Sequence, residues 1–266
     1  MILSNSAGVP ISVAVITRNE EDRLPACLES LGFADEVVVV DSGSADRTVE
    51  RARALGARVM IEPWRGFSAQ KQFAVDRCSY DWVLILDADE RVPLDTSQTI
   101  KRALSEVVPE VNAYSFKRKN YLDGHWIKHC GWWPDRVVRL VNREKGRFDG
   151  RPVHEKWLPQ GRVVPLDAFI EHASFRNYSD LVVKMEHYSN LTSKDLFDRG
   201  VHANALTPLI HGLWMFLKTY LWELGFLEGF DGMLISTMNA GGSFLKYAKL
   251  MELAKTAARE NQPDPP

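Results

Sequence analysis

The chain has few cysteines and no strong excess of charge, and each absence excludes a class of protein. Its 266 residues contain three cysteines at wide, irregular spacings, so neither a disulfide framework nor a CxxC zinc pattern can be built from them. This usage favours a reducing compartment. The formal net charge is −2, whereas nucleic-acid-binding proteins usually carry a basic surface. We therefore expect a protein that does not bind nucleic acid.

We also expect neither a targeting segment nor a membrane-spanning segment. The N-terminal stretch MILSNSAGVP has no basic region followed by an apolar core, so we expect no signal peptide. No uncharged apolar run reaches the length of about 20 residues that crosses a bilayer. Together these features predict a cytoplasmic protein.

The first hundred residues alternate between apolar, β-branched runs and helix-forming segments. ISVAVIT, EVVVVD, ARVMIE and WVLILD have the composition of buried strands. Strands that are apolar on both faces and separated by helices predict βαβ units in a parallel sheet. After Val92, NAYSFKRKNYL and RVVRLVN alternate in polarity and favour antiparallel strands. The expected fold class is α/β, a Rossmann-like mixed sheet with a parallel N-terminal half.

The C-terminal part of the chain has a different pattern. From about Tyr178 to about Ala258 the sequence is typical of helices, and ENQPDPP at the end is polar and rich in proline. We therefore expect an α/β domain over residues 1–177, a helical extension over 178–258 and a disordered tail over 259–266.

Polar residues follow three of the predicted parallel strands. They are Thr17, Asn19 and Glu20 after the first strand, Asp41 and Ser42 after the second, and Asp87 and Asp89 after the fourth. In open parallel sheets, ligands bind at the carboxyl ends of the strands. These side chains should therefore line one crevice.

The stretch DWVLILDADERV places Asp87, Asp89 and Glu90 together at the end of an apolar run, where their charges repel each other. A divalent cation with oxygen ligands would supply the missing positive charge. The alternative is that Asp89 and Glu90 only cap the next helix. A phosphatase-type DxD fits poorly because Arg91 follows Glu90 and the motif is not on the first strand.

A dinucleotide-binding fold is a second alternative for the crevice. No GxGxxG follows the first strand, where TRNEED stands instead. Asp41 is placed to accept a hydrogen bond from a ribose or a base, although an Asx turn would explain it equally well.

Four stretches carry a resemblance to a known family. ISVAVITRNEEDRLPACLESL, VVVVDSGSADRT, WRGFSAQKQFA and WVLILDADE, in this order and spacing, resemble family 2 glycosyltransferases of the GT-A fold. GRPVHEKW, EHASFRNYSDLVVKMEHYSN and LGFLEGFDGM are similar to the bacterial lipopolysaccharide-core β-1,4-glucosyltransferases that act on inner-core heptose. The resemblance extends from about Ile11 to about Leu250. It implies inverting transfer from a UDP-sugar, UDP-glucose in that subgroup, with Mg²⁺ or Mn²⁺.

The resemblance also implies the residues that hold the donor. Those in contact with it would be Thr17, Asn19, Glu20, Asp41, Ser42, Lys71 and Asp87. Lys71 would face the diphosphate, although a solvated helix face is its alternative. Asp89 would bind the metal, and His172 would be a second ligand, although a lone histidine is more often structural.

Inversion requires a base on the acceptor side, which takes the proton of the attacking hydroxyl. By resemblance this base would be Glu155, with His154 orienting it or contacting phosphate. Asp135 is the alternative base. Trp132 and Trp133 beside it would stack on sugar rings or belong to the core.

The segment 204–230 is apolar and aromatic but is interrupted by His211, Lys218 and Glu223. It either packs against the catalytic domain or a second subunit of a homodimer, or lies in a membrane interface. The family resemblance favours the inner face of the cytoplasmic membrane, where a lipid-anchored saccharide acceptor would be embedded. Functional alternatives are a different nucleotide sugar, a peptide or lipid-carrier acceptor, or a nucleotide-sugar-binding module without transfer.

Overall fold

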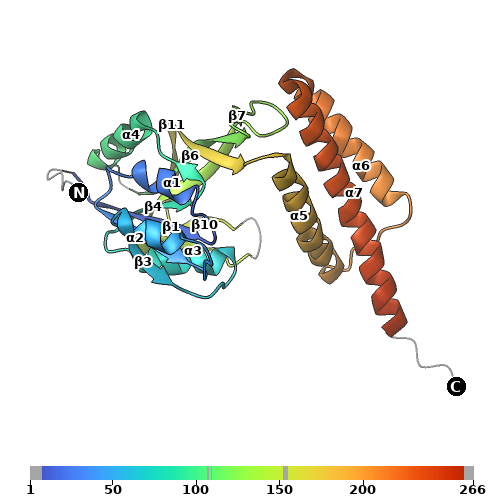
Figure 1. Cartoon of the computed structure of the whole chain (residues 1–266), viewed down its shortest axis with the longest axis horizontal. Coiled ribbons are helices and arrows are strands. Elements are labelled where there is room, and N and C mark those ends of the chain that lie inside the picture. The colour runs from blue at the N-terminus through green and yellow to red at the C-terminus, as the bar shows by residue number, and fades with distance from the viewer. Residues whose placement is uncertain (1–7, 107, 109, 152–154, 261–266) are drawn as a thin grey trace. The chain divides into compact units, whose positions relative to one another are not determined.

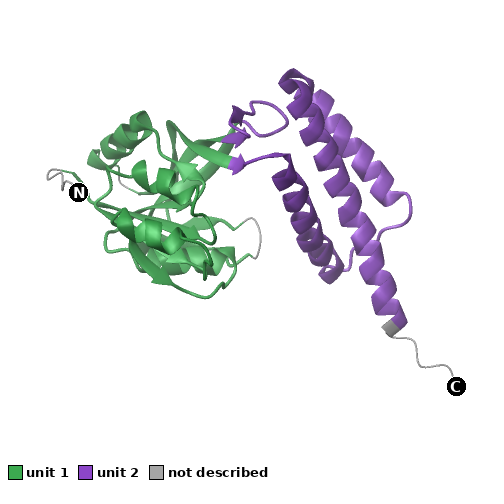
Figure 2. Ribbon diagram, viewed as in Figure 1, with its two compact units in different colours: residues 1–119, 134–173 green, residues 120–133, 174–266 purple. Residues whose placement is uncertain are grey.

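The computed structural model describes all residues except 1–7, 107, 109, 152–154 and 261–266 (Figure 1). The chain divides into two compact units (Figure 2). Unit 1 comprises Met1–Lys119 and Pro134–Ala173, and unit 2 comprises Asn120–Trp133 and Ser174–Pro266. The functional division into residues 1–177, 178–258 and 259–266 stays a prediction.

One sheet organises unit 1, with the strand order β3-β2-β1-β4-β8-β6-β11-β5. The parallel half consists of β1 (Ile11–Thr17), β2 (Glu36–Asp41), β3 (Arg58–Ile61) and β4 (Trp82–Asp87). The rest is formed by β5 (Glu90–Arg91), β6 (Val111–Leu122), β8 (Asp135–Asn142) and β11 (Arg162–Phe175). β8 is antiparallel to both β4 and β6. The expected α/β class with a parallel N-terminal half is confirmed.

Both faces of the parallel half are buried, which explains its continuous apolar runs. On one face, Val13, Val15 and Leu84 pack with Leu24 of α1. On the other face, Ala14, Ile85 and their neighbours pack with Val75 of α3. The helices of unit 1 are α1 (Leu24–Glu29), α2 (Thr48–Ala54), α3 (Phe67–Asp76) and α4 (Leu94–Ser105). Two short strands, β9 (Gly146–Phe148) and β10 (Trp157–Pro159), form a separate antiparallel pair.

Unit 2 is helical, as the C-terminal sequence predicts. Its helices are α5 (Tyr178–Asp198), α6 (Thr207–Leu217) and α7 (Gly229–Glu260). A π-helical turn, η2 (Lys218–Trp222), and a 3₁₀ turn, η3 (Gly225–Glu228), join α6 to α7. Gly232 is required there, because a Cβ at this position would lie 1.8 Å from the carbonyl oxygen of Gly225.

Residues 120–133 of unit 2 pack against its helices and share a hydrophobic core with them. The short strand β7 (His125–Trp126) pairs with β6, and Leu122 and Ile127 pack with Leu181 and Ile235. Among the described residues, no helix combines the length and the apolarity needed to cross a bilayer.

All three cysteines are buried as free thiols. Burial raises the pKa of Cys78 and of Cys130 to about 12 in each case, with nearby carboxylates adding to the effect. Burial also raises the pKa of Cys27, and Glu90 contributes in the same direction.

Candidate active site

The polar ends of the parallel strands lie at one edge of the sheet. Thr17 at the end of β1 pairs in register with Asp41 at the end of β2. The preceding residue of β1, Ile16, pairs with Asp87 at the end of β4. The Thr17 Oγ1 atom is buried and has no hydrogen-bond partner among the described residues. An unsatisfied hydroxyl at a strand end suits a binding site, because a ligand can complete its hydrogen bonding.

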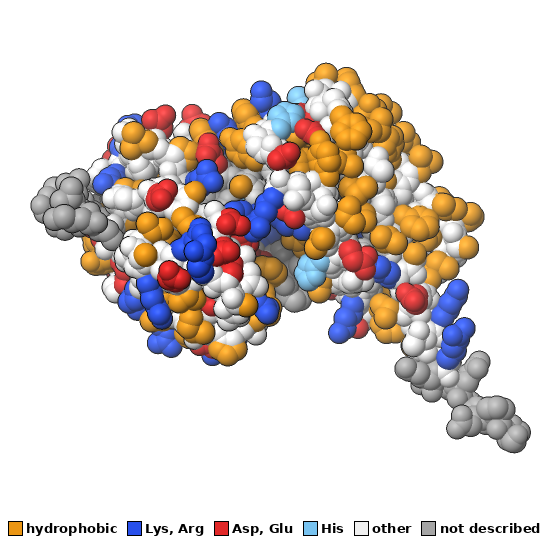
Figure 3. All heavy atoms as spheres, viewed as in Figure 1, with side chains coloured by type: hydrophobic (Ala, Val, Ile, Leu, Met, Phe, Trp, Pro, Cys, Tyr) orange, Lys and Arg blue, Asp and Glu red, His pale blue; other side chains and the backbone are white. Residues whose placement is uncertain are grey.

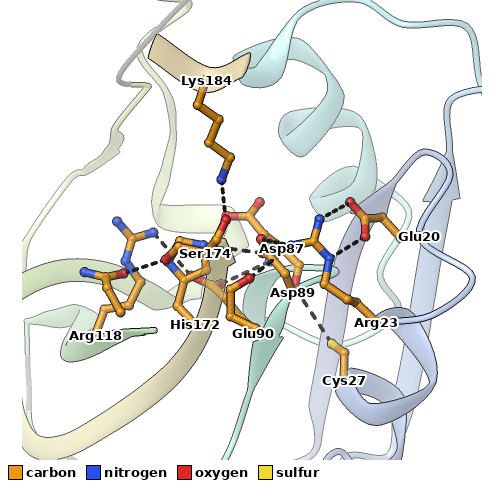
Figure 4. A network of polar contacts seen from close by, with 12 residues as sticks. Glu20, Arg23, Cys27, Asp87, Asp89, Glu90, Arg118, His172, Ser174 and Lys184 are labelled. Atoms are coloured by element: carbon orange, nitrogen blue, oxygen red, sulfur yellow. Dashed lines mark hydrogen bonds and ion pairs between the residues drawn. The ribbon is translucent and has the colours of Figure 1, made fainter. Parts of the chain in front are cut away.

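Arginine side chains compensate the buried part of the carboxylate cluster (Figure 4). Arg139 Nη2 lies 2.7 Å from Asp87 Oδ2 and 2.5 Å from Glu90 Oε1. Arg118 Nη1 lies 3.4 Å from the same Glu90 oxygen, and the Asp87 amide donates to Glu90 Oε2 at 3.0 Å. The Glu90 side chain is fully buried. Capping of the next helix by Glu90 is therefore wrong, since α4 begins at Leu94 without a side-chain cap.

Lys71 of α3 is the second buried cation in the cluster. Its Nζ atom lies 2.9 Å from Asp87 Oδ1 and 2.8 Å from Glu155 Oε1. The alternative of a solvated helix face is wrong, because the Lys71 side chain is only 4% exposed. Burial by itself would raise the pKa of Asp87, but the charges of Lys71 and Arg139 outweigh it and hold this pKa well below its usual range. For Asp87 and Glu90, the expectation that a metal supplies the missing charge is thus corrected: the protein supplies it.

Asp89 has no ion pair with Lys71 or Arg139 in the described structure and instead faces His172 and Arg23. The two-residue strand β5 pairs with β11, and Glu90 lies opposite His172 in the register. His172 Nε2 is 3.4 Å from Asp89 Oδ1, and Arg23 Nη1 is 3.4 Å from Asp89 Oδ2. Burial alone would raise the pKa of Asp89, but the charge and the hydrogen bond of His172 lower it by more. The pKa therefore lies below its usual range. The carboxylate is therefore held in its charged form.

Asp89 and His172 fit a divalent cation that has open coordination positions. Their side chains are 15% and 14% exposed, so both are partly exposed. A carboxylate and an imidazole are suitable ligands for Mn²⁺. In the described part of the chain, no group of three or more His, Cys, Asp or Glu side chains is arranged to hold a metal. The protein thus offers two ligands, and phosphate and water oxygens would complete the sphere.

The loop residues expected to hold the donor are mostly bonded to each other. Asp41 Oδ2 accepts from the amides of Gly43 and Ser44 at 2.9 and 2.8 Å, which is the Asx-turn alternative. Asn19 has a φ of 54° and accepts from the Ala45 amide at 2.8 Å. These bonds fix the two loops to each other at the edge of the sheet. Donor contact by these residues stays a prediction.

Two further donor candidates are also engaged within unit 1. Both carboxylate oxygens of Glu20 accept from Arg23, at 2.7 and 3.0 Å. Ser42 Oγ accepts from the amide nitrogen of Gln70 at 3.1 Å. Arg23 also donates to the carbonyl of Ala173 at 3.0 Å, which ties α1 to the end of β11.

The acceptor-side candidates have separate environments. Asp135 Oδ2 is held by Arg118, whose Nη2 lies at 2.6 Å. Glu155 is bound to Lys71, and His154 lies outside the described residues. Trp132 stacks on Phe175 with ring centroids 5.3 Å apart, and Trp133 packs edge-on against Trp126. Contact of either tryptophan with a sugar stays a prediction.

The sequence analysis did not identify Arg23, Arg118 and Arg139 as part of this cluster. Arg139 had a detectable signal, because it stands next to Leu140 and Val141, both of which are buried. A charged residue in a buried strand requires an opposite charge. For Arg23 and Arg118 no comparable signal exists, since neither stands within an apolar run of the sequence.

Comparisons with known proteins identify the family of the chain. The family model described as glycosyl transferase family 2 matches residues 12–157, more than half of the chain, so the protein belongs to that family and is a glycosyltransferase. The lipopolysaccharide core biosynthesis glycosyltransferase LpsC of Rhizobium meliloti is 33% identical, over 96% of this chain and 97% of its own. An uncharacterized glycosyltransferase of Rickettsia typhi, RT0209, is 32% identical, over 92% of this chain and 87% of its own.

Solved structures show a weaker similarity. Glucosyl-3-phosphoglycerate synthase from Mycobacterium tuberculosis, in complex with Mn²⁺, UDP and glucosyl-3-phosphoglycerate, matches with a TM-score of 0.36 and 27% identity. The match covers 43% of this chain and 45% of that one.

Proposed function

We propose that this glycosyltransferase moves glucose from UDP-glucose to a saccharide of the lipopolysaccharide core, with inversion and with Mg²⁺ or Mn²⁺. The observation that carries the metal-dependent part is the Asp89–His172 pair, 3.4 Å apart at the edge of the sheet. The acceptor class rests on the similarity to LpsC along nearly the full length of both chains.

The chemistry requires stabilisation of a leaving diphosphate. When bound between Asp89 and His172, the cation would offset the charge that develops on the phosphate oxygens. Thr17, with its unsatisfied hydroxyl, is assigned to hold the nucleoside together with the loops after β1 and β2. Asp87 is kept ionised by Lys71 and Arg139 and lies beside the same edge.

Glu155 is assigned as the base that accepts the proton of the attacking hydroxyl. The carboxylate is on the loop before β10 and is 2.8 Å from Lys71 Nζ. Lys71 keeps a second contact with Asp87, so its charge stays compensated when Glu155 turns toward an acceptor. Asp135 is a weaker candidate for the base, because Arg118 binds it through both Nε and Nη2.

A membrane surface is proposed as the partner of unit 2. The exposed apolar side chains Leu206, Leu209, Ile210, Leu213, Trp214, Leu217 and Leu221 recur at helical spacing along α6 and η2, and Trp222 is 83% exposed. Figure 3 shows hydrophobic side chains gathered over this helical unit. Tryptophan is typical of membrane–water interfaces.

Basic residues lie beside this apolar surface. A groove of about 780 Å³ has Leu209 and Phe244 in its wall together with three basic residues, Lys249, Lys255 and Arg259, and one acidic residue, Glu252. Apolar and basic side chains in one groove match a bilayer with anionic headgroups. On this basis the enzyme works at the cytoplasmic face of the membrane, where its acceptor is anchored. A second copy of the chain is the competing occupant.

Calorimetric titration tests the nucleotide and the metal together. UDP, GDP, ADP and CDP are titrated in turn, each with Mn²⁺ and each with EDTA. UDP should bind only with Mn²⁺, and Asp89→Ala should abolish that binding. Asp167→Ala, which removes a carboxylate that is 97% exposed, is the matched control. Tight UDP binding by Asp89→Ala would overturn the metal assignment.

Turnover separates the remaining alternatives. A nucleotide-sugar-binding module without transfer would bind UDP-glucose and release no UDP in the presence of lipopolysaccharide acceptors. A panel of UDP-sugars tests the donor, and peptide or lipid-phosphate acceptors test the other acceptor classes. Transfer to any of these in preference to a lipopolysaccharide core would contradict the proposed acceptor.

Vesicle flotation tests the membrane partner. The protein should float with vesicles of phosphatidylethanolamine and phosphatidylglycerol, and Trp214→Ser/Trp222→Ser should reduce the floated fraction. Trp64→Ser removes another exposed tryptophan, from unit 1, and should not reduce it. Equal flotation of the wild type, Trp214→Ser/Trp222→Ser and Trp64→Ser would contradict the membrane proposal. So would a stable wild-type dimer that Trp214→Ser/Trp222→Ser disrupts.

A further inference from the structure

A groove of about 740 Å³ lies along α3 and the β9 region of unit 1, away from the carboxylate cluster. Its described lining includes four arginines, Arg65, Arg143, Arg147 and Arg151, and two acidic residues, Asp76 and Glu144. Arginine prevails in this groove although the whole chain has a net charge of −2. Such a concentration of guanidinium groups is typical of sites for phosphate or carboxylate.

The arginines differ in how far the protein already satisfies them. Arg143 donates to the carbonyl of Cys78 and contacts Glu144, so its role is partly structural. Arg151 contacts Asp149 at 3.2 Å, but its side chain is 63% exposed. Arg147 is exposed and forms no ion pair within the described part of the chain. Arg147 and Arg151 are therefore available to a ligand.

The beginning of α3 adds to the attraction for anions. No side chain caps this ten-residue helix, and Gly66, Ser68 and Ala69 of its N-terminal end line the groove. A helix N-terminus carries a partial positive charge and attracts negative groups. The groove thus combines two independent sources of positive potential.

The same loop serves the groove and the proposed base. Asp149 Oδ1 accepts from the amides of Arg151 and Lys156, at 3.1 and 3.2 Å, and closes the loop between β9 and β10. Arg151 lines the groove, while Glu155, near the other end of this loop, reaches Lys71 on α3. α3 itself contributes Lys71 to the cluster and Gln72 to the groove. The groove and Glu155 are therefore connected through α3 and through the residues at the two ends of this loop.

We propose that this groove binds a phosphate or carboxylate group of the acceptor saccharide, through Arg147 and Arg151. The inference rests on the proposed function, because it identifies the acceptor as an anionic saccharide. Guanidinium groups bind such anions through paired, charge-assisted hydrogen bonds. The diphosphate of the donor has the same chemistry, so the test must separate the two sources.

The test is an NMR titration of glucose 6-phosphate, followed through the arginine side-chain signals, with glucose as the neutral control. The titration is run with Mg²⁺ alone and again with saturating UDP. Glucose 6-phosphate should bind in both cases, glucose should not, and Arg147→Gln/Arg151→Gln should weaken binding by about tenfold or more. Arg147→Gln alone removes no internal contact and should show part of the loss. Arg102→Gln, an exposed arginine of α4, is the matched control.

Three results would overturn the proposal. Unchanged binding by the double variant would exclude the groove, and an equal loss in Arg102→Gln would mean nonspecific attraction. Competition by UDP would assign the phosphate to the donor site. UDP titrations of the same variants separate this failure from that of the proposed function, because donor binding should be unchanged in both arginine variants.

Discussion

Lys71 Nζ lies 2.8 Å from Glu155 Oε1 and 2.9 Å from Asp87 Oδ1, so one buried ammonium group joins the end of β4 to the loop before β10. The two carboxylates come from segments that are distant in the sequence. Without the cation between them they would repel each other in a poorly solvated place. Lys71 therefore sets the spacing between Asp87 and the proposed base, Glu155.

Replacement of Lys71 by methionine should lower kcat/KM by about 100-fold or more, because it removes a fixed charge beside the reacting groups. Lys71 lowers the pKa of Asp87, so its loss should raise that pKa. The acid limb of the pH–rate profile should accordingly move to higher pH. Lys71→Arg keeps the charge and should leave the limb closer to the wild-type position. An unshifted limb in Lys71→Met would contradict this role.

Glu155→Gln should lower turnover by about 10²- to 10⁴-fold, the usual contribution of a general base. Binding of UDP with Mn²⁺, measured by calorimetry, should stay close to that of the wild type. Asp135→Asn is the matched comparison, since it neutralises the other acceptor-side carboxylate. If Asp135→Asn loses turnover in this way and Glu155→Gln does not, Asp135 is the base.

Arg139→Met should destabilise the protein by about 3–5 kcal/mol, because it leaves the fully buried Glu90 charge without its closest partner. Urea denaturation measures this loss. Glu90→Gln in the same background should restore part of it, since the uncompensated charge is then gone. If the effects of the two substitutions simply add, the pair is not coupled, and the explanation fails.

Glu36 should make the folding stability of unit 1 depend on pH in the acidic range. Burial alone would raise its pKa, but hydrogen bonds from Ser12, Ser79 and Arg58 lower the pKa to about 2, from 4.5. A lowered folded-state pKa adds stability above pH 4.5, and this is lost as the pH falls from 4.5 toward 2.

The Glu36→Gln variant should therefore lose less stability than the wild type across that interval, as measured by urea denaturation at several pH values. Glu50→Gln, at an exposed position of α2, is the control and should follow the wild-type pH dependence. Parallel curves for the wild type and Glu36→Gln would contradict the assignment.

The sequence was sufficient to predict the parallel half of the sheet. Its strands are buried on both faces, as Val13 and Ala14 on opposite sides of β1 illustrate, and such strands appear as continuous apolar runs. The position of Thr17, Asp41 and Asp87 at one edge followed from the parallel arrangement. Both inferences depend only on local patterns.

The charge compensation of the site could not be predicted in the same way. It depends on the pairing of β4 with β8, which brings Arg139 to Asp87, and of β5 with β11, which brings His172 to Asp89. Registers between strands 50 or more residues apart leave no local trace. The expected position of His172 came from the family resemblance and not from spacing.

The buried thiols give each unit its own chemical reporter. Cys27 and Cys78 belong to unit 1 and Cys130 to unit 2, and all three are protonated and shielded in the native state. An alkylating reagent can modify them only when the surrounding structure opens. Mass spectrometry of the labelled peptides would then give a separate opening rate for each unit within the intact chain.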